Sequence, residues 1–237
     1  MISKDLLKES CAKYGITITD EMAGRFDAYA GMLVDWNSRV NLTAITDPDE
    51  IVYKHFLDSL LCLTAKNVSC ETKIVDIGTG AGFPGIPLLI YENSASLTMI
   101  DGNNKRIRFL DFVLNELGLK AETIHGRAED IGRKTEYRES YDLSFARAVS
   151  HLRELSEYCI PFLKLGGSFI AMKGSSIKDE LNEAGRAISE MGGKLVEVHT
   201  VILPNENTRN LVEIEKVAPT PDKYPRPSAK MAKKPIV

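Results

Sequence analysis

A glycine-rich loop, VDIGTGAGFPGIP at residues 75–87, is the segment of the sequence best suited to binding a cofactor. It leaves an apolar segment typical of a strand and enters a segment typical of a helix. Gly78, Gly80 and Gly82 permit sharp turns and a close approach to a ligand, because a β-carbon at these positions would intrude. The loop therefore predicts a ligand site at the carboxyl end of a strand.

Two adenosine-containing cofactors fit this loop, and its neighbouring residues distinguish them. Positions 80, 82 and 85 match the G-x-G-x-x-G fingerprint of NAD-binding loops, in which helix amides receive a pyrophosphate. Pro84 removes one of those amides, and Asp76 adds a negative charge near the place of the phosphates. A cationic sulfonium carries no phosphate and tolerates the acid. These residues therefore favour S-adenosylmethionine, with an NAD-dependent oxidoreductase as the alternative.

Asp101 is the second candidate cofactor ligand. It ends the next predicted strand, 19 residues after Gly82. An acid at this point of such a fold can bind both ribose hydroxyls of an adenosine. The alternative is a turn-forming aspartate before Gly102. The position supports an adenosine ligand without distinguishing between the two cofactors.

The elements that must position these residues alternate between strands and helices. Strands are expected at 73–78, 96–101, 121–126, 141–146 and 167–173, and helices at 86–92, 103–118, 151–164 and 176–191. This alternation predicts a Rossmann-like α/β fold, with a mostly parallel sheet and helices on both faces. The segments 194–203 and 210–217 have no helix between them and predict an antiparallel pair at the sheet's end.

The chain divides into three predicted parts. Residues 1–66 form a helical N-terminal extension, in which Thr19 is the expected N-cap of the second helix and Pro48 suits the first turn of the third. Residues 67–217 form the Rossmann-like domain. Residues 218–237 form a basic, proline-containing C-terminal tail.

Several motifs together resemble one family, the ribosomal RNA small subunit methyltransferase G family, also called glucose-inhibited division protein B. They occur in the family's order as WNSRVNLTAI (36–45), HFLDSL (55–60), VDIGTGAGFPGIPL (75–88), DGNNKRIRFL (101–110), GRAED (126–130), FARAV (145–149), MKG (172–174) and TPDKYPRPSAKMAKKP (220–235). Many methyltransferases share the glycine loop, whereas WN-x-x-x-NLT, HFLDSL and the KYPR tail are far more specific. The match spans nearly the whole chain.

The resemblance implies a Rossmann-like class I methyltransferase that uses S-adenosylmethionine to methylate N7 of a guanine in the 16S rRNA of the small ribosomal subunit. It also implies cofactor contacts at Gly78, Phe83, Ala128, Glu129 and Arg147, each of which falls inside a matching motif. The pair Gly102-Asn103 departs from the serine-containing pair that is usual in the family, which leaves the ribose and adenine contacts open in detail.

Methylation at guanine N7 needs no general base, because N7 attacks with a lone pair and loses no proton. The enzyme has to align N7 with the methyl carbon and the departing sulfur. The sequence has no N-P-P-Y or D-P-P-Y segment after the fourth predicted strand and no Pro-Cys pair. Arg147 occupies that place and is the candidate catalytic residue, where it can hold the methionine carboxylate, a phosphate or the guanine O6 edge. The alternative is a structural ion pair.

Candidate RNA contacts are spread along the chain. His55 and Asp58 lie three apart on one predicted helical face, as a hydrogen-bonded pair near RNA or as packing residues. Trp36 either stacks on a splayed base or belongs to the core. The basic candidates for phosphate contact, beside His55, are Lys105, Arg106, Lys173, Lys223, Arg226 and Lys230.

The charge distribution favours local contact with nucleic acid. The net charge is −3, yet residues 218–237 carry five Lys and Arg against Asp222 alone. This tail either meets phosphate or is a solvated terminus. If it meets phosphate, its deletion is expected to weaken RNA binding more than cofactor binding.

The cysteines, the histidines and the lengths of the apolar runs argue against a metalloprotein and a membrane protein. Scattered cysteines and histidines predict no metal site, and the cysteines fit a reducing cytoplasm. No apolar run approaches the roughly 18 residues that span a bilayer. We expect a cytoplasmic monomer. The alternatives to an rRNA methyltransferase are a small-molecule methyltransferase with the N-terminal helices as a lid, and a non-catalytic RNA-binding assembly factor.

Overall fold

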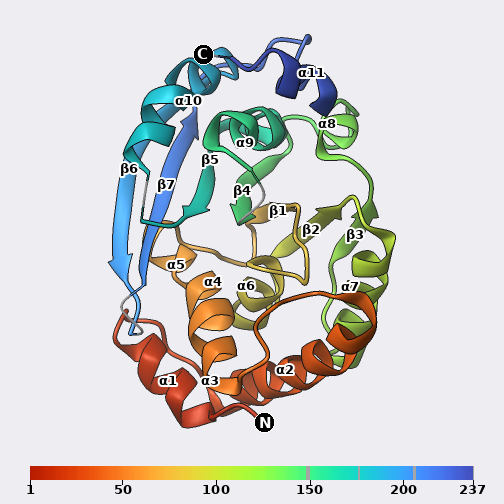
Figure 1. Cartoon of the computed structure of the whole chain (residues 1–237), viewed down its shortest axis with the longest axis vertical. Coiled ribbons are helices and arrows are strands. Elements are labelled where there is room, and N and C mark those ends of the chain that lie inside the picture. Colours follow the sequence, from red (N-terminus) through yellow and green to blue (C-terminus); the bar gives the residue numbers. More distant parts are fainter. Residues whose placement is uncertain (148–149, 176, 205–206, 237) are drawn as a thin grey trace.

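A seven-stranded sheet forms the centre of the protein, in a computed structural model that describes residues 1–147, 150–175, 177–204 and 207–236. The strands lie in the order β3-β2-β1-β4-β5-β7-β6 (Figure 1). Their bounds are β1 (Lys73–Ile77), β2 (Ser96–Asp101), β3 (Glu122–His125), β4 (Tyr141–Arg147), β5 (Leu163–Lys173), β6 (Gly193–Ile202) and β7 (Thr208–Lys216). Strands β1 to β5 pair in parallel, and β7 is antiparallel to both β5 and β6. The predicted Rossmann-like sheet with a terminal antiparallel pair is confirmed.

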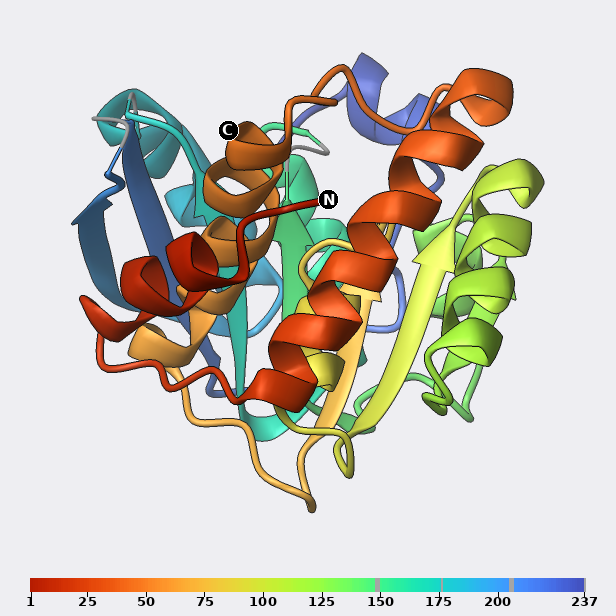
Figure 2. The same cartoon turned by 90° about the horizontal axis from the view of Figure 1, so that it is seen from below.

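Helices cover both faces of the sheet (Figures 1 and 2). The first face carries α1 (Lys4–Ala12), α2 (Asp20–Val40), α3 (Pro48–Ile51), a π-helical turn η1 (Val52–Leu57), α4 (Asp58–Leu60), α5 (Cys62–Ala65), α6 (Gly85–Tyr91) and α7 (Asn104–Glu116). The second face carries α8 (Ala128–Ile131), α9 (Leu152–Cys159), a 3-10 turn η2 (Ile160–Phe162), α10 (Lys178–Glu190) and α11 (Ser228–Lys233). Within β1, Ile74 joins the core of the first face and Val75 and Ile77 join that of the second. A strand buried on both faces is typical of a doubly wound fold.

The local signals for helix boundaries explain most of these elements. Thr19 caps α2, because its Oγ1 accepts a hydrogen bond of 3.2 Å from the amide of Met22, and Pro48 occupies the first turn of α3. Two helices differ clearly from the prediction, and β5 begins at Leu163, four residues before the predicted strand. The third helix is interrupted by the π-helical turn, and α9 ends at Cys159 because Pro161 cannot continue an α-helix. The last two positions of the FARAV motif, 148 and 149, lie outside the described residues.

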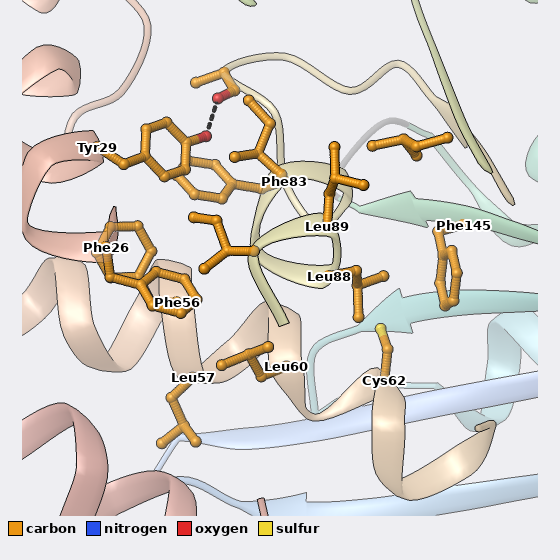
Figure 3. Packing of buried hydrophobic residues seen from close by; sticks show 14 of the residues in the cluster. Phe26, Tyr29, Phe56, Leu57, Leu60, Cys62, Phe83, Leu88, Leu89 and Phe145 are labelled. Carbon is orange, nitrogen blue, oxygen red and sulfur yellow. Dashed lines mark hydrogen bonds between the residues drawn. The ribbon is translucent and has the colours of Figure 1, made fainter. Parts of the chain in front are cut away.

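The N-terminal extension packs directly on the glycine loop (Figure 3). Tyr29 of α2 is fully buried, and its hydroxyl donates a hydrogen bond to the carbonyl of Ala81 in the loop. Its ring centroid lies 5.5 Å from those of both Phe56 and Phe83. The extension and the Rossmann-like domain therefore share one core.

The C-terminal residues also belong to the folded body. After β7 the chain crosses the second face of the sheet and ends in α11, which lies beside α8 and α9 (Figure 1). Tyr224 and Met231 of this segment are buried. The predicted tail is therefore no solvated terminus, because it places apolar side chains in the core. We call residues 219–236 the C-terminal strap.

The replacement of Gly82 by alanine is expected to destabilise the protein. Gly82 has φ +97°, and a β-carbon there would lie 2.7 Å from Ile86 Cδ1 and 2.8 Å from the Tyr29 hydroxyl. We expect Gly82→Ala to lower the free energy of unfolding by about 2 kcal/mol in urea titrations. Gly24→Ala within α2 is the matched control, because its β-carbon would meet nothing within 4 Å and helix propensity favours alanine. Equal stabilities of the two variants would contradict this account of the loop.

Candidate functional site

A cavity lined by two carboxylates opens at the carboxyl ends of β1, β2 and β3, and we call it the acidic cavity. Its lining residues are Ile77, Gly78, Ile100, Asp101, Gly102, Gly126, Arg127, Ala128, Glu129, Ser150 and Tyr158. Four of the predicted cofactor residues line this cavity: Gly78, Asp101, Ala128 and Glu129. The lining contains two acids, one guanidinium and several apolar side chains. Because the acids outnumber the single cation, it suits the adenosine of a cofactor with a cationic sulfonium better than it suits a pyrophosphate.

Asp101 is held in a fixed orientation at the end of β2. Its Oδ2 accepts a hydrogen bond of 3.0 Å from the Gly80 amide, and its Oδ1 accepts one of 2.8 Å from the Asn103 amide. Arg106 Nη1 lies 3.4 Å from Oδ2. Each carboxylate oxygen has about two lone-pair sites, so the carboxylate keeps capacity to accept bonds from ribose hydroxyls.

Glu129 lines the acidic cavity from the start of α8. Its side chain is buried, and its Oε1 accepts a hydrogen bond of 3.1 Å from the backbone amide of Ser228. Ala128 precedes it and contributes an apolar surface. A carboxylate with one oxygen fixed by the protein is a suitable acceptor for the amino group of an adenine.

Asp76, Gly80, Gly82 and Phe83 were predicted as cofactor contacts, but they do not line the acidic cavity. The fully buried Asp76 Oδ2 accepts hydrogen bonds from the Thr79 hydroxyl at 2.7 Å and from the Gly85 amide at 2.9 Å. Burial raises the pKa of Asp76 to about 6, despite these bonds. Asp76 therefore acts by holding the two ends of the glycine loop together.

A second cavity of about 540 Å³ lies between the end of β4 and the start of β7, and we call it the basic cavity. It is lined by Ile45, Lys54, Asp58, Arg147, Met172, Lys173, Gly174, Ser175, Leu203, Asn207, Thr208 and Arg209. Among the residues that the structure describes, four cationic side chains thus face one carboxylate. The excess positive charge suits a ligand that carries phosphates.

Arg147 connects the sheet to the N-terminal extension. Its Nη1 donates hydrogen bonds to the Lys54 carbonyl at 2.9 Å and to Asp58 Oδ2 at 3.0 Å. The fully buried Asp58 also accepts a bond from Arg209, which lies 151 positions away. The ion pair that the sequence left as the alternative for Arg147 is thus present, and Arg147 also lines the basic cavity. Sequence reasoning missed Arg209, because no local pattern signals a partner so distant.

His55 is a buried neutral side chain in this cluster. Arg147 Nη2 lies 3.1 Å from His55 Nδ1, and Thr43 Oγ1 lies 2.9 Å from His55 Nε2. Because arginine only donates, Nδ1 accepts and Nε2 carries the proton. Burial, with the charge of Arg147 beside the ring, lowers the pKa of His55 to about 3. The predicted direct pair with Asp58 is replaced by Arg147, which binds both residues.

Phe83 forms the wall behind this histidine. The two ring centroids are 4.4 Å apart with an interplanar angle of 15°, and the Arg147 guanidinium carbon lies 4.7 Å from the centre of the Phe83 ring. The glycine loop is thereby packed against the residues of the basic cavity. The loop thus lines the acidic cavity through Gly78 and supports Arg147 of the basic cavity through Phe83.

The predicted RNA contacts occupy three different places. Lys105 and Arg106 lie at the start of α7, beside the acidic cavity. Lys173 lines the basic cavity, where its Nζ lies 3.1 Å from Glu180 and 2.6 Å from the Ser150 carbonyl. Lys223 and Lys230 are exposed on the C-terminal strap.

Arg226 departs from the prediction. Its guanidinium and its backbone amide both bind the buried carboxylate of Glu157, and only 14% of its side chain is exposed. It therefore anchors the C-terminal strap, and its charge is already compensated.

Trp36 is half-buried and packs against the core, which agrees with the structural alternative for this residue. Its ring lies 5.6 Å from the ring of Phe109 and 5.2 Å from that of Phe112, between centroids. The neighbouring Asn37 uses its side-chain oxygen to accept hydrogen bonds from the amides of Leu42 and Thr43. This end of α2 is therefore structural.

The described residues offer neither a metal site nor a membrane-spanning helix. Among residues 1–147, 150–175, 177–204 and 207–236, no group of three or more His, Cys, Asp or Glu side chains could hold a metal ion. None of the helices in this part of the chain has the length and apolar character to cross a bilayer.

Solved structures with a similar fold support the class that the sheet and the acidic cavity define. An S-adenosylmethionine-dependent O-methyltransferase from Thermotoga maritima superimposes with a TM-score of 0.53 at 17% identity, over 80% of this chain and 72% of that chain. A precorrin-6y C5,15-methyltransferase from Geobacter metallireducens gives a TM-score of 0.52 at 15% identity, over 67% and 87%. The fold is that of a class I S-adenosylmethionine-dependent methyltransferase.

Sequence comparisons then specify the family. The model of the rRNA small subunit methyltransferase G family matches residues 22–212, and the chain belongs to that family. Ribosomal RNA small subunit methyltransferase G of Alkaliphilus metalliredigens is 46% identical over 238 residues, which cover 100% of both chains. The protein of the same name from Clostridium perfringens is 43% identical over 234 residues, or 98% of both chains. The family predicted from the motifs is confirmed.

The buried neutral state of His55 predicts a pH dependence of stability. Its pKa is about 3 in the folded protein against 6.5 for an exposed histidine, so the unfolded chain binds the extra proton between these values. The contribution of His55 to stability is complete above pH 6.5 and is lost as the pH falls towards 3. We expect His55→Gln to flatten the plot of unfolding free energy against pH by about 1.4 kcal/mol per unit in this window.

The difference between wild type and His55→Gln isolates this residue. Asp76, whose pKa is raised to about 6, contributes with the opposite sign as the pH rises, but it does so equally in both proteins. Parallel pH profiles from urea titrations would show that folding does not lower the pKa of His55, against this account.

Proposed function

We propose that this chain transfers the methyl group of S-adenosylmethionine to N7 of a guanine in the 16S rRNA of the small ribosomal subunit. The observation that carries the proposal is the pair of cavities on either side of the end of β4. One cavity is lined by acids suited to an adenosine, and the other is lined by cations suited to RNA. The names of the relatives support the choice of ribosomal RNA.

In this proposal the acidic cavity holds the cofactor. Asp101 accepts the ribose hydroxyls, and Glu129 accepts the amino group of the adenine. Gly78, with φ +66°, turns the chain so that the backbone passes close to the ligand. S-adenosylmethionine, when bound, supplies a methyl group on a cationic sulfur.

The basic cavity suits a nucleophile that loses no proton. Asp58, the lining carboxylate within the described part of the chain, is fully buried and already bound by Arg147 and Arg209. His55 beside it has its Nε2 proton directed at Thr43 and its Nδ1 directed at Arg147. Neither group is free to take a proton from a substrate. Arg147 and its partners therefore hold the base and its phosphates in place, and the reaction depends on alignment.

The basic residues around the two openings would contact the RNA backbone. Lys105, Lys223 and Lys230 are exposed, whereas Lys173 lines the basic cavity itself. A substrate of this kind also supports the expected location in the cytoplasm. Contacts of lysine with phosphate weaken as salt increases, so binding to the subunit is expected to be strongly salt-dependent.

Small ribosomal subunits from cells that lack this gene test the proposal. The purified protein is incubated with methyl-labelled S-adenosylmethionine and these subunits, and the modified nucleotide is mapped by mass spectrometry. We expect label at N7 of one guanine in 16S rRNA. Label on a small molecule alone would favour a small-molecule methyltransferase. Salt-dependent binding of subunits without transfer would favour an assembly factor.

Arg147→Ala is expected to lower methyl transfer by about 100-fold, since small displacements of the reacting groups are costly. Arg147→Lys keeps a charge near the buried Asp58 but loses the planar fork, so it separates charge from geometry. Arg25→Ala is the matched control, because Arg25 pairs with Glu21 near the start of α2. Transfer rates of Arg147→Ala equal to those of the control would remove Arg147 from the site.

A further inference from the structure

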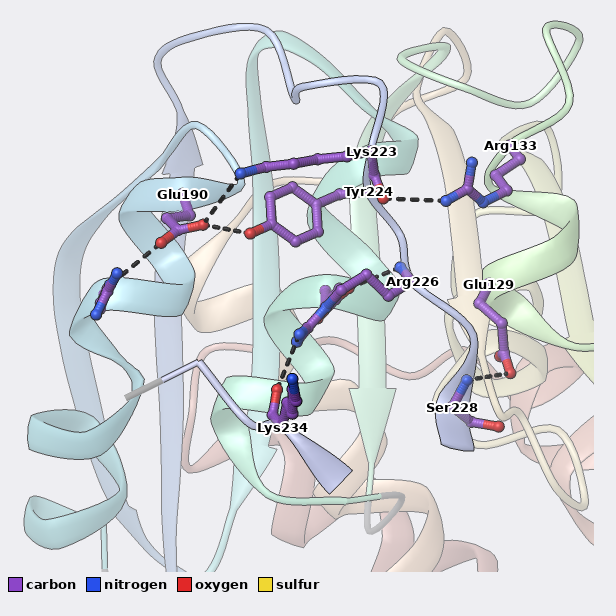
Figure 4. Close-up of polar contacts among 10 residues, drawn as sticks. Glu129, Arg133, Glu190, Lys223, Tyr224, Arg226, Ser228 and Lys234 are labelled. Carbon is purple, nitrogen blue, oxygen red and sulfur yellow. Dashed lines mark hydrogen bonds and ion pairs between the residues drawn. The ribbon is translucent and has the colours of Figure 1, made fainter. Parts of the chain in front are cut away.

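The C-terminal strap is joined to the body of the protein by one buried ion pair and by hydrogen bonds, several of which are drawn in Figure 4. Arg226 donates to Glu157 of α9 from Nε at 2.8 Å and from Nη2 at 2.8 Å, and Glu157 is only 1% exposed. The hydroxyl of the buried Tyr224 donates a hydrogen bond to Glu190 of α10. A buried carboxylate held by a bidentate guanidinium is costly to separate, so the strap has a defined position.

Further contacts hold the backbone of the strap against the loop after α8. Arg138 donates to the carbonyl of Tyr224 at 2.9 Å and to that of Thr220 at 2.6 Å. Arg133 donates to the carbonyl of Lys223 at 3.0 Å. Three arginines, two from the body and one from the strap, thus determine its path over α8 and α9.

This path brings the strap to the wall of the acidic cavity. The backbone amide of Ser228, the first residue of α11, donates a hydrogen bond of 3.1 Å to Glu129 Oε1. Glu129 lines the cavity and is 6% exposed, and Tyr158, which follows the anchor residue Glu157, lines it as well. Figure 4 shows Ser228 and Glu129 directed towards each other from α11 and α8.

We propose that the C-terminal strap is a positioning element for the adenosine end of the cofactor, acting through the hydrogen bond from the Ser228 amide to Glu129. The proposal rests on the proposed function, in which the acidic cavity binds S-adenosylmethionine. One oxygen of the Glu129 carboxylate is fixed by the strap, so the carboxylate is oriented before the ligand arrives. Preorganisation of this kind improves affinity by lowering the cost of ordering on binding.

The strap therefore serves the cofactor site as well as any RNA that its lysines contact. The charge of residues 218–237 alone suggested that their deletion would affect RNA binding more than cofactor binding. The geometry points to a cofactor effect that does not depend on RNA. The positioning group is a backbone amide, so no side-chain charge is involved on the strap.

A single substitution removes this amide. Ser228 occupies the first helical position of α11, where proline is tolerated, and the preceding Pro227 has φ −57° and ψ 140°, which suits a residue before proline. Ser228→Pro deletes the donor, and Ser228→Ala keeps it. The two variants thus differ chiefly in the hydrogen bond to Glu129.

The test measures binding of S-adenosylhomocysteine to the full chain by calorimetry, without RNA. We expect Ser228→Pro to raise the dissociation constant by about three- to tenfold and Ser228→Ala to leave it unchanged, as expected for loss of a hydrogen bond to a charged group. In methyl transfer, the KM for S-adenosylmethionine should rise by the same factor, with kcat and the KM for the subunit unchanged. A merely structural role would lower the melting temperature without raising the KM for S-adenosylmethionine selectively over the other kinetic constants.

Two further variants cover the other outcomes. Deletion of residues 228–237 removes α11 but keeps the contact between Arg226 and Glu157. If Ser228→Pro folds poorly, this deletion takes its place, and we expect the same rise of about three- to tenfold in the dissociation constant. The double variant Lys233→Ala, Lys234→Ala removes charge but no donor to Glu129, and it should bind as wild type.

The possible failures are distinguishable. Equal affinities of Ser228→Pro and Ser228→Ala, with tight binding by wild type, would overturn the role of the strap alone. The same holds if the double lysine variant loses as much affinity as Ser228→Pro. No binding of S-adenosylhomocysteine by wild type would overturn the proposed cofactor site, and the role of the strap with it.

Discussion

The carboxylate of Asp58 is the buried charge on which the arrangement of the basic cavity depends. It is fully buried, and a buried charge is stable only when it is paired and hydrogen-bonded. Its partners are Arg147 at the end of β4 and Arg209 near the start of β7. Because Asp58 belongs to the N-terminal extension, its pairing fixes three distant segments relative to one another. The extension is thus a wall of the cavity and part of the folded core.

A second buried carboxyl group orders the glycine loop beside the acidic cavity. The carboxyl group of Asp76 holds Thr79 and Gly85, so the glycine loop is closed from beneath. Phe83 from this loop then packs against Arg147, which lines the basic cavity, and against the neighbouring His55. Both cavities are therefore shaped by contacts that the protein makes with itself. Such preorganised surfaces suit a reaction that requires alignment and no proton transfer.

The sequence predicted what depends on local patterns and missed what depends on distant contacts. Strand and helix periodicity, together with the glycine spacing, identified the sheet and the place of Asp101, because these signals lie within a few residues of one another. Nothing near Arg226 in the sequence indicates its buried partner Glu157, 69 positions away. The sequence alone therefore does not distinguish a solvated basic terminus from a basic segment that is anchored on the folded body. The sequence allowed a packing role for His55, but its partners Phe83 and Arg147 lie too far away along the chain to be predicted.

The most direct measurement is a crystal structure of this protein with S-adenosylhomocysteine and a guanine nucleotide. The proposed function predicts the adenosine in the acidic cavity, with Asp101 at the ribose hydroxyls and Glu129 at the adenine. It also predicts that the sulfur faces the end of β4 and that the guanine, with N7 towards the sulfur, lies in the basic cavity. An adenosine bound in the basic cavity, or a guanine whose N7 faces away from the sulfur, would contradict this assignment of the two cavities.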